Sequence, residues 1–223
     1  MLCSFCSTKD IQGTLIRRRA AAATVDWMEA LAARGLRRFV FVDNTFNIPR
    51  SYAEELCREI ARRRLDLNLW CIVYPKWVDG ALVELMARAG CREVSLGFES
   101  GSDAILANLN KRFRKADVRT TARLFAEAGI ARTGFLMMGS PGESRDTVEA
   151  SLEFAESLRL ESVKITVGVR IYPNTRLAAT ALAEGVIAPG DDLLRPRFYL
   201  APGLGDWLAE RVAAYKRTRP WVL

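Results

Sequence analysis

The chain has 223 residues, of which 50% are hydrophobic and 26% are charged, and its net charge is +7. This composition supports a substantial folded core and excludes disordered, collagen-like and fibrous proteins. Histidine is absent, which excludes Ser-His-Asp and Cys-His catalytic machinery and every His-ligated metal site.

Helical and strand patterns alternate from residue 24 to about residue 169. The predicted elements are helix 24–34, strand 38–43, helix 50–64, strand 67–73, helix 79–89, strand 93–98, helix 115–128, strand 131–138, helix 144–158 and strand 162–169. Such alternation predicts parallel strands joined by right-handed helical crossovers, in a doubly wound sheet or a (β/α) barrel. The pattern then weakens to a helix over 175–184, a turn-rich stretch, a short FYL segment and a helix over about 205–217. No linker marks a second domain.

The lengths of the apolar runs and the distribution of charge indicate the location and partners of the protein. No apolar run approaches the roughly 20 residues needed to span a bilayer, and the N-terminus lacks the layout of a secretory signal. We therefore expect a cytoplasmic protein. The positive charge is spread along the chain without a basic tail, which gives little support to a nucleic-acid partner.

Polar or glycine-rich residues follow three of the predicted strands. Strand 38–43 ends at Asp43 and is followed by Asn44, Glu99 and Ser100 follow strand 93–98, and Gly139 follows strand 131–138. In both parallel architectures ligands bind at the carboxyl ends of the strands. We expect the ligand site among these residues.

Cys3 and Cys6 stand three residues apart ahead of the first helix. Two thiolates at this spacing can share one metal ion or cluster. The pair alone is ambiguous. A zinc site would need further ligands, and a redox pair should follow a strand. An incidental pair of cysteines explains the spacing equally well. The other cysteines, at 57, 71 and 91, are scattered. Cys71 lies within a predicted strand, where we expect it in the core.

Five segments resemble the radical S-adenosylmethionine enzyme family. They are CSFC at 3–6, DNTF at 43–46, GFESGS at 97–102, MMGSPGES at 137–144 and RIYPNT at 170–175. The resemblance covers residues 1 to about 177, and is closest to the branch with an N-terminal cobalamin-binding domain, to which methylthiotransferases are related. It implies a partial (β/α)6 TIM-like barrel over 1–177, followed by a C-terminal helical extension over 178–223.

The family motif CxxxCxxC supplies three thiolates to a 4Fe-4S cluster, and S-adenosylmethionine chelates the fourth iron. Cys3 and Cys6 match the second and third cysteines, and Phe5 matches the aromatic residue usual before the third. The first cysteine would stand two residues upstream of Met1, and the first strand of the barrel is missing with it. We therefore expect the chain to begin inside the motif, as a fragment or from a mis-assigned start, and to be nearly inactive as given. A degenerate family member is the less favoured explanation.

The resemblance also implies which residues bind S-adenosylmethionine. They are Asp43, Asn44, Gly97, Glu99, Ser100 and Gly139. Structural alternatives stay open for them: a solvated turn at 43–44, a helix N-cap near Ser100, and a purely structural turn at Gly139.

Strand 162–169 carries cations on one face. The opposite face is formed by valines and an isoleucine and should pack under helices, so Lys164 and Arg170 should point into the barrel. Enclosed cations need anionic partners, which the cofactor carboxylate, an acidic substrate or internal acids could supply. The fork of arginine suits a carboxylate or phosphate, so we expect Arg170 to bind such a group.

The function implied by the resemblance is reductive cleavage of S-adenosylmethionine at a 4Fe-4S cluster, for radical-based modification of a small-molecule substrate, methyl transfer included. An electron donor such as flavodoxin or ferredoxin is implied, and so is cobalamin through the N-terminal domain of the branch. The tail after residue 175 is too short and too helical for the RNA-binding β-barrel of methylthiotransferases, so we do not expect a tRNA substrate. The alternatives are a non-catalytic α/β binding domain and a methylthiotransferase-like enzyme.

Overall fold

The computed structural model describes residues 3–223, which form two compact units. The early-strand unit contains Ile16–Gly97 and Ala116–Gly134. The late-strand unit contains Phe98–Lys115, Phe135–Leu223 and the described residues up to Leu15. The predicted extension over 178–223 lies wholly in the late-strand unit, and its boundary at residue 177 stays a prediction.

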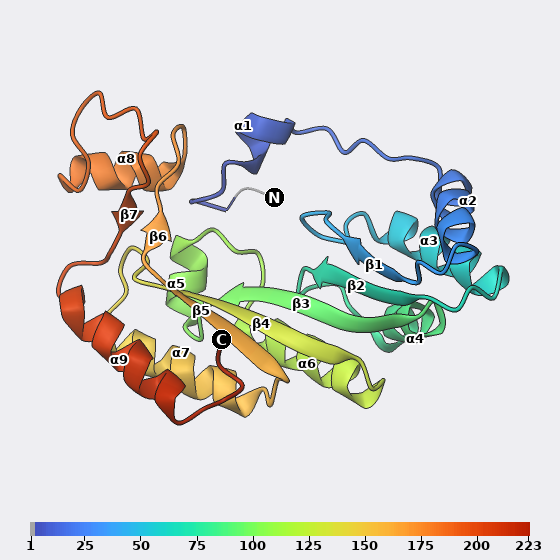
Figure 1. Ribbon diagram of the computed structural model, residues 1–223. Coiled ribbons are helices and arrows are strands. Elements are labelled where there is room, and N and C mark those ends of the chain that lie inside the picture. The colour runs from blue at the N-terminus through green and yellow to red at the C-terminus, as the bar shows by residue number, and fades with distance from the viewer. Residues whose placement is uncertain (1–2) are drawn as a thin grey trace. The chain divides into compact units, whose positions relative to one another are not determined.

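Five strands form one parallel sheet in the order β1-β2-β3-β4-β5 (Figure 1). They are β1 (Arg38–Phe41), β2 (Asn68–Val73), β3 (Cys91–Glu99), β4 (Ala131–Met138) and β5 (Ser162–Val167). This topology confirms the predicted α/β class and corresponds to a partial TIM-like barrel.

The predicted strand 162–169 is two strands. Gly168 adopts φ 80°, a left-handed conformation open to glycine, and its N–H donates to the Met138 carbonyl oxygen at 2.7 Å. The chain therefore leaves the main sheet after β5. The next two residues form β6 (Val169–Arg170), which pairs antiparallel with β7 (Phe198–Tyr199).

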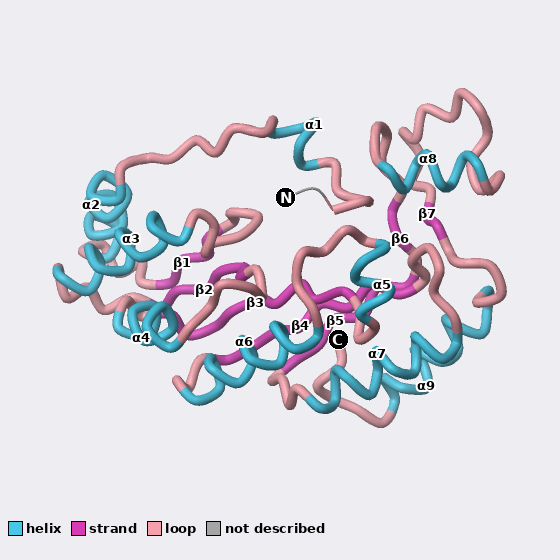
Figure 2. The backbone as a smooth tube through the Cα atoms, turned by 180° about the vertical axis from the view of Figure 1, so that it is seen from behind, coloured by secondary structure: helices cyan, strands magenta, loops and turns pink. Residues whose placement is uncertain are grey.

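Three consecutive helices pack together in the early-strand unit. α2 (Ala21–Ala32) packs against α3 (Arg50–Arg62), and α3 packs against α4 (Gly80–Arg88) (Figure 2). Strand β2 alternates between buried and exposed residues, and its buried side chains are Leu69, Cys71 and Val73. α6 (Lys115–Glu127) lies almost wholly in this unit.

The late-strand unit has its own helices, and two of them run side by side (Figure 1). They are α7 (Arg145–Ser157) and α9 (Gly205–Arg217), joined by a two-bond ion pair between Arg211 and Glu149 at 2.5 and 2.6 Å. α9 also packs against β5, where Val163 is fully buried while Lys164 on the opposite face is exposed. After α9, Val222 pairs with Val163 and so covers part of the strand edge.

Three further helices belong to this unit: α1 (Thr8–Gln12), α5 (Asp103–Asn108) and α8 (Arg176–Ala183). The sequence patterns miss α1 and α5, and place the start of α2 at residue 24 instead of 21. No helix within residues 3–223 is both long and apolar enough to cross a membrane.

Three cysteines lie in the core of the early-strand unit. Cys57 of α3, Cys71 of β2 and Cys91 of β3 are each at most 2% exposed, which confirms the core placement predicted for Cys71. Burial raises the pKa of Cys57 to about 12. A hydrogen bond with Cys91, together with burial, raises the pKa of Cys71 well above its usual value. Cys57 and Cys71 are therefore protonated at neutral pH, and burial shields all three thiols from solvent.

We predict that these three thiols resist alkylation in the folded protein. Iodoacetamide at pH 8 should modify the half-buried Cys3 and Cys6 first, because a thiolate must form and be accessible in order to react. Mass spectrometry of peptides gives the order of labelling, and protein unfolded in urea serves as the control in which all five react. If Cys57 or Cys71 were labelled as fast as Cys6 in the native protein, their burial in the core would be contradicted.

Candidate cofactor site

Cys3 and Cys6 lie in a single turn of the late-strand unit. The Cys6 N–H donates to the Cys3 carbonyl oxygen at 3.3 Å, and both residues are half-buried. Two longer-range hydrogen bonds fix this turn: Ser4 N–H donates to the Leu109 carbonyl at 3.0 Å, and Leu177 N–H donates to the Ser4 carbonyl at 2.9 Å. Leu109 follows α5 and Leu177 lies in the first turn of α8. The turn is therefore tied to the ends of two helices.

A buried ion pair lies beside this turn. Lys111 Nζ is 3.0 Å from Glu99 Oε1, and the two side chains are only 8% and 15% exposed. Lysine is almost never buried unless it is paired. The ammonium also lies 5.2 Å from the ring centre of Phe5 and 5.8 Å from that of Phe113. The pair thus connects the end of β3 with the cysteine turn.

The backbone at Glu99 is unusual. Its φ is 64°, in the left-handed region that few residues other than glycine adopt. Such a conformation costs on the order of 1 kcal/mol and persists only where the surroundings hold it. Here the ion pair to Lys111 holds the side chain, and Ser100 N–H donates to the Phe98 carbonyl at 2.8 Å. Strain of this kind is concentrated at functional sites.

Opposing effects act on the thiol of Cys3. Burial raises its pKa, the positive charge of Lys111 opposes that rise, and the neighbouring Cys6 and Glu99 add to it. Metals bind the thiolate form, so occupation of this turn by a metal would release protons. Lys111 is the cation within the late-strand unit that most favours the thiolate at Cys3.

The donor set fits part of an iron–sulfur site. Iron in such clusters is held by cysteine thiolates, and Cys3 and Cys6 supply two from one turn. In the part of the chain that the structure describes, no three Cys, Asp or Glu side chains are placed to hold a metal ion. The third thiolate of the family motif is therefore not among these residues. Beside the turn, Glu99 and Lys111 offer one negative and one positive charge, which suits a zwitterionic ligand.

Two predicted cofactor residues have their polar groups engaged within the protein. Ser100 is fully buried, with its Oγ 3.1 Å from Ser151 Oγ of α7. Gly139 N–H donates to Glu143 Oε2 at 2.5 Å, and a Cβ at Gly139 would lie 2.5 Å from Leu200. These arrangements favour a structural role for both, and cofactor binding by either stays a prediction.

The other predicted residues are dispersed. Asp43 and Asn44 are exposed residues after β1, and Gly97 is half-buried in β3; all three belong to the early-strand unit. Lys164 is exposed on β5, and Arg170 is half-buried on β6. The late-strand unit thus brings together Cys3, Phe5, Cys6 and Glu99, while binding by the remaining residues stays a prediction.

Sequence reasoning misses two residues of this region. Lys111 lies in a turn-rich segment with no strand end or periodic pattern to mark it, so no signal in one sequence singles it out. Glu143 stands within a quoted motif, but its role is visible only in the structure. It is 5% exposed, and its Oε2 accepts from the N–H groups of Gly139 and Ser140. Burial raises its pKa, and it fixes the turn after β4.

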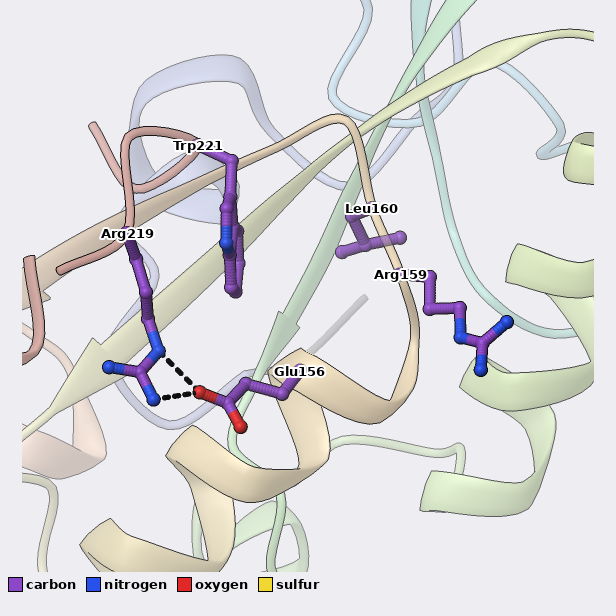
Figure 3. A pocket seen from close by; sticks show the side chains of 5 residues that line it. All are labelled: Glu156, Arg159, Leu160, Arg219 and Trp221. Carbon is purple, nitrogen blue, oxygen red and sulfur yellow. Dashed lines mark hydrogen bonds and ion pairs between the residues drawn. The ribbon is translucent and has the colours of Figure 1, made fainter.

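A cavity of about 300 Å³ lies elsewhere in the late-strand unit, where α7 ends and the C-terminal tail passes (Figure 3). It is lined by Glu156, Arg159, Leu160, Arg219 and Trp221. Arg219 forms an ion pair with Glu156 and stacks on Tyr215 with its guanidinium 4.0 Å from the ring centre. The cavity shares no lining residue with the predicted site, so we leave it out of the candidate site.

Comparison with known proteins gives a family match and curated relatives. The model of the radical SAM superfamily matches residues 1–155. Tryptophan 2-C-methyltransferase from Streptomyces laurentii is 32% identical over 196 residues, which cover 82% of this chain and 33% of that protein. Cytidylyl-2-hydroxyethylphosphonate methyltransferase from Streptomyces wedmorensis is 28% identical, over 96% of this chain and 43% of that protein. The chain thus spans less than half the length of these relatives.

A solved structure is similar along the whole chain. It is the radical S-adenosylmethionine methyltransferase TsrM from Kitasatospora setae, with cobalamin and a [4Fe-4S] cluster bound. The TM-score is 0.89 at 26% identity, and the match covers 100% of this chain and 52% of that one.

We predict that Lys111→Met lowers the free energy of unfolding by about 3 kcal/mol, because it leaves the buried carboxylate of Glu99 without its counter-ion. The double variant Glu99→Gln with Lys111→Met should recover part of this loss, since no uncompensated charge remains. Urea denaturation measures both.

Arg123→Met is the matched control. Arg123 pairs with Glu127 at 2.7 Å, but the two side chains are 60% and 57% exposed. Its loss should change stability by less than about 0.5 kcal/mol. If Lys111→Met lowered the free energy of unfolding no more than this control does, the Glu99–Lys111 pair would not stabilise the fold as described.

Proposed function

The chain belongs to the radical SAM superfamily, and we propose that it forms the cofactor-binding domain of an enzyme that transfers a methyl group to a small-molecule substrate. The observation that carries the proposal is the meeting of the Cys3–Cys6 turn with the buried Glu99–Lys111 pair. The two curated relatives and the solved structure are all methyltransferases by name, which supports the reaction class. Because they are much longer, the activity of the whole protein is part of this proposal.

Enzymes of the family use a 4Fe-4S cluster and S-adenosylmethionine, which when bound supply one-electron chemistry that no side chain provides. In this chain Cys3 and Cys6 would hold iron as thiolates. The turn is fixed at Ser4 from two sides, so both sulfurs are positioned before any metal binds.

The charged pair would bind the amino-acid end of S-adenosylmethionine. Lys111 can donate to a carboxylate, and Glu99 can accept from an ammonium group. In the free protein each satisfies the other at 3.0 Å, so neither charge is left uncompensated. Phe5, whose ring lies 5.2 Å from the lysine ammonium, contributes apolar surface that limits the access of water.

We extend the proposal to two further partners. Cobalamin is present in the similar TsrM structure, which supports its use by the complete protein. Reduction of the cluster requires an electron donor, for which we propose a flavodoxin or ferredoxin. A cytoplasmic location stays a prediction.

A small-molecule substrate is favoured over a nucleic acid by how the cations of α3 are paired. Arg50 bonds both Glu54 and Asp79, and Arg63 bonds Glu59, so these two cations are already compensated. Phosphate-binding surfaces instead present unpaired cations.

The test of cluster binding compares three proteins. One is the 223-residue chain, and two carry an N-terminal extension with either cysteine or serine four positions before Cys3. After anaerobic reconstitution, the cysteine version should hold about four irons per chain, since the third thiolate completes the ligand set. The other two should hold far less. Iron analysis and EPR after reduction give the readout, and a stoichiometric cluster on the unextended chain would refute the requirement.

The loaded cysteine version then tests the function. With S-adenosylmethionine, cobalamin and a reductant it should generate 5'-deoxyadenosine or S-adenosylhomocysteine, detected by mass spectrometry. If the fully loaded protein forms neither of these two products, the proposed function is contradicted.

A further inference from the structure

The β6–β7 sheet carries a cation that has no anionic partner. Arg170 Nε is buried and has no hydrogen-bond partner in the structure, and its guanidinium makes no ion pair among residues 3–223. The guanidinium carbon lies 5.1 Å from the ring centre of Tyr172. A buried N–H donor without an acceptor is costly, so a protein retains one where a ligand supplies the acceptor.

The stacking on Tyr172 determines which part of the guanidinium is available. An aromatic ring occupies the face of the planar group and leaves the N–H donors at its edge. Those donors form a fork that matches the two oxygens of a carboxylate or a phosphate. Arg170 is therefore arranged to bind an oxyanion in the plane of the guanidinium.

An exposed aromatic side chain lies next to this cation. Arg170 is paired directly with Phe198 across the β6–β7 ladder, which places both side chains on one face of the two strands. Phe198 is 52% exposed. A Cβ at Gly168 would lie 3.3 Å from the Phe198 Cβ, so the glycine leaves room for the phenylalanine. Cation and apolar surface are thus adjacent.

The chain runs from this group directly to the cysteine turn. Thr175 Oγ1 donates to the Tyr172 carbonyl at 2.7 Å and accepts from Ala178 N–H at 3.1 Å, which caps α8. One residue before Ala178, Leu177 donates to the Ser4 carbonyl of the turn. A ligand at Arg170 would therefore lie on a segment that is hydrogen-bonded to the cofactor turn.

We propose that Arg170, Tyr172 and Phe198 form the substrate subsite, and that the substrate is an acid in which a carboxylate or phosphate is attached to an apolar body. This rests on the proposed function. The cofactor's own charged end is matched by Glu99 and Lys111, which supply both signs, whereas Arg170 supplies only a positive charge.

The test measures binding of three probes to the cluster-free 223-residue chain by isothermal titration calorimetry. 3-Phenylpropionate has the acid and the apolar body, 3-phenylpropionamide has the same shape without the charge, and propionate has the acid alone. We expect 3-phenylpropionate to bind at least about tenfold more tightly than either of the others.

Variants assign the effect to residues. Arg170→Gln should remove the preference for acid over amide, a loss of about tenfold or 1.4 kcal/mol, and Arg170→Lys should retain part of it because the charge remains without the fork. Phe198→Ala should weaken acid and amide alike. Arg197→Gln is the matched control, since Arg197 is a neighbouring cation that pairs with Asp191 at 3.3 Å. It should leave the preference unchanged.

The ratio of acid to amide affinity is measured within each protein, so partial unfolding of a variant does not imitate the result. Equal affinities in the unchanged protein, no binding at millimolar probe, or an unaltered ratio in Arg170→Gln would each overturn the subsite. Displacement of 3-phenylpropionate by methionine, which carries the charged end of the cofactor, would assign Arg170 to the cofactor instead. Probe binding is measured without a cluster. A negative binding result would therefore leave the cluster reconstitution unaffected, and a failed reconstitution would leave the binding result unaffected.

Discussion

The buried ion pair between Glu99 and Lys111 is the constraint on which the candidate site depends. A lysine ammonium that is 8% exposed requires an anion, and the carboxylate that supplies it stands on a residue with φ 64°. The pair therefore fixes both the end of β3 and the segment after α5. The ammonium also lies over the ring of Phe5, so the pair contacts the cysteine turn as well.

Backbone hydrogen bonds also hold the cysteine turn in place. Ser4 is bonded through its N–H to Leu109 and through its carbonyl to Leu177, two residues that are far apart in the sequence. A short N-terminal segment that buries little apolar surface could not fold by itself, and α1 has no buried residue. Its position is determined by the helix ends that it contacts. Leu177, which donates to the Ser4 carbonyl, lies on the segment that runs back through Thr175 to Arg170, so the cofactor turn and the proposed substrate subsite are connected through this segment.

Sequence patterns predict the elements that have long apolar repeats and fail where structure depends on contacts between distant residues. The strands β2, β4 and β5 and the long helices were predictable because each buries one periodic face. The helices α1 and α5 were not, since five and six residues give too little periodicity. Strand 162–169 is predicted as one strand because a single glycine does not end its alternating pattern. In the structure Gly168, with φ 80°, divides it into two strands.

The candidate site shows the same limit. The spacing of Cys3 and Cys6 is local and can be recognised, but the pairing of Glu99 with Lys111 spans α5 and the turn after it, which no local rule predicts. The buried hydroxyl of Ser100, bonded to Ser151, likewise depends on how α7 packs.

A crystal structure of the cluster-loaded protein with S-adenosylmethionine bound tests the central claim most directly. The account predicts iron bound by the sulfurs of Cys3 and Cys6, with the amino-acid end of the cofactor between Glu99 and Lys111 in place of their mutual contact. A bound cofactor elsewhere, with Glu99 and Lys111 still paired only to each other, would contradict it.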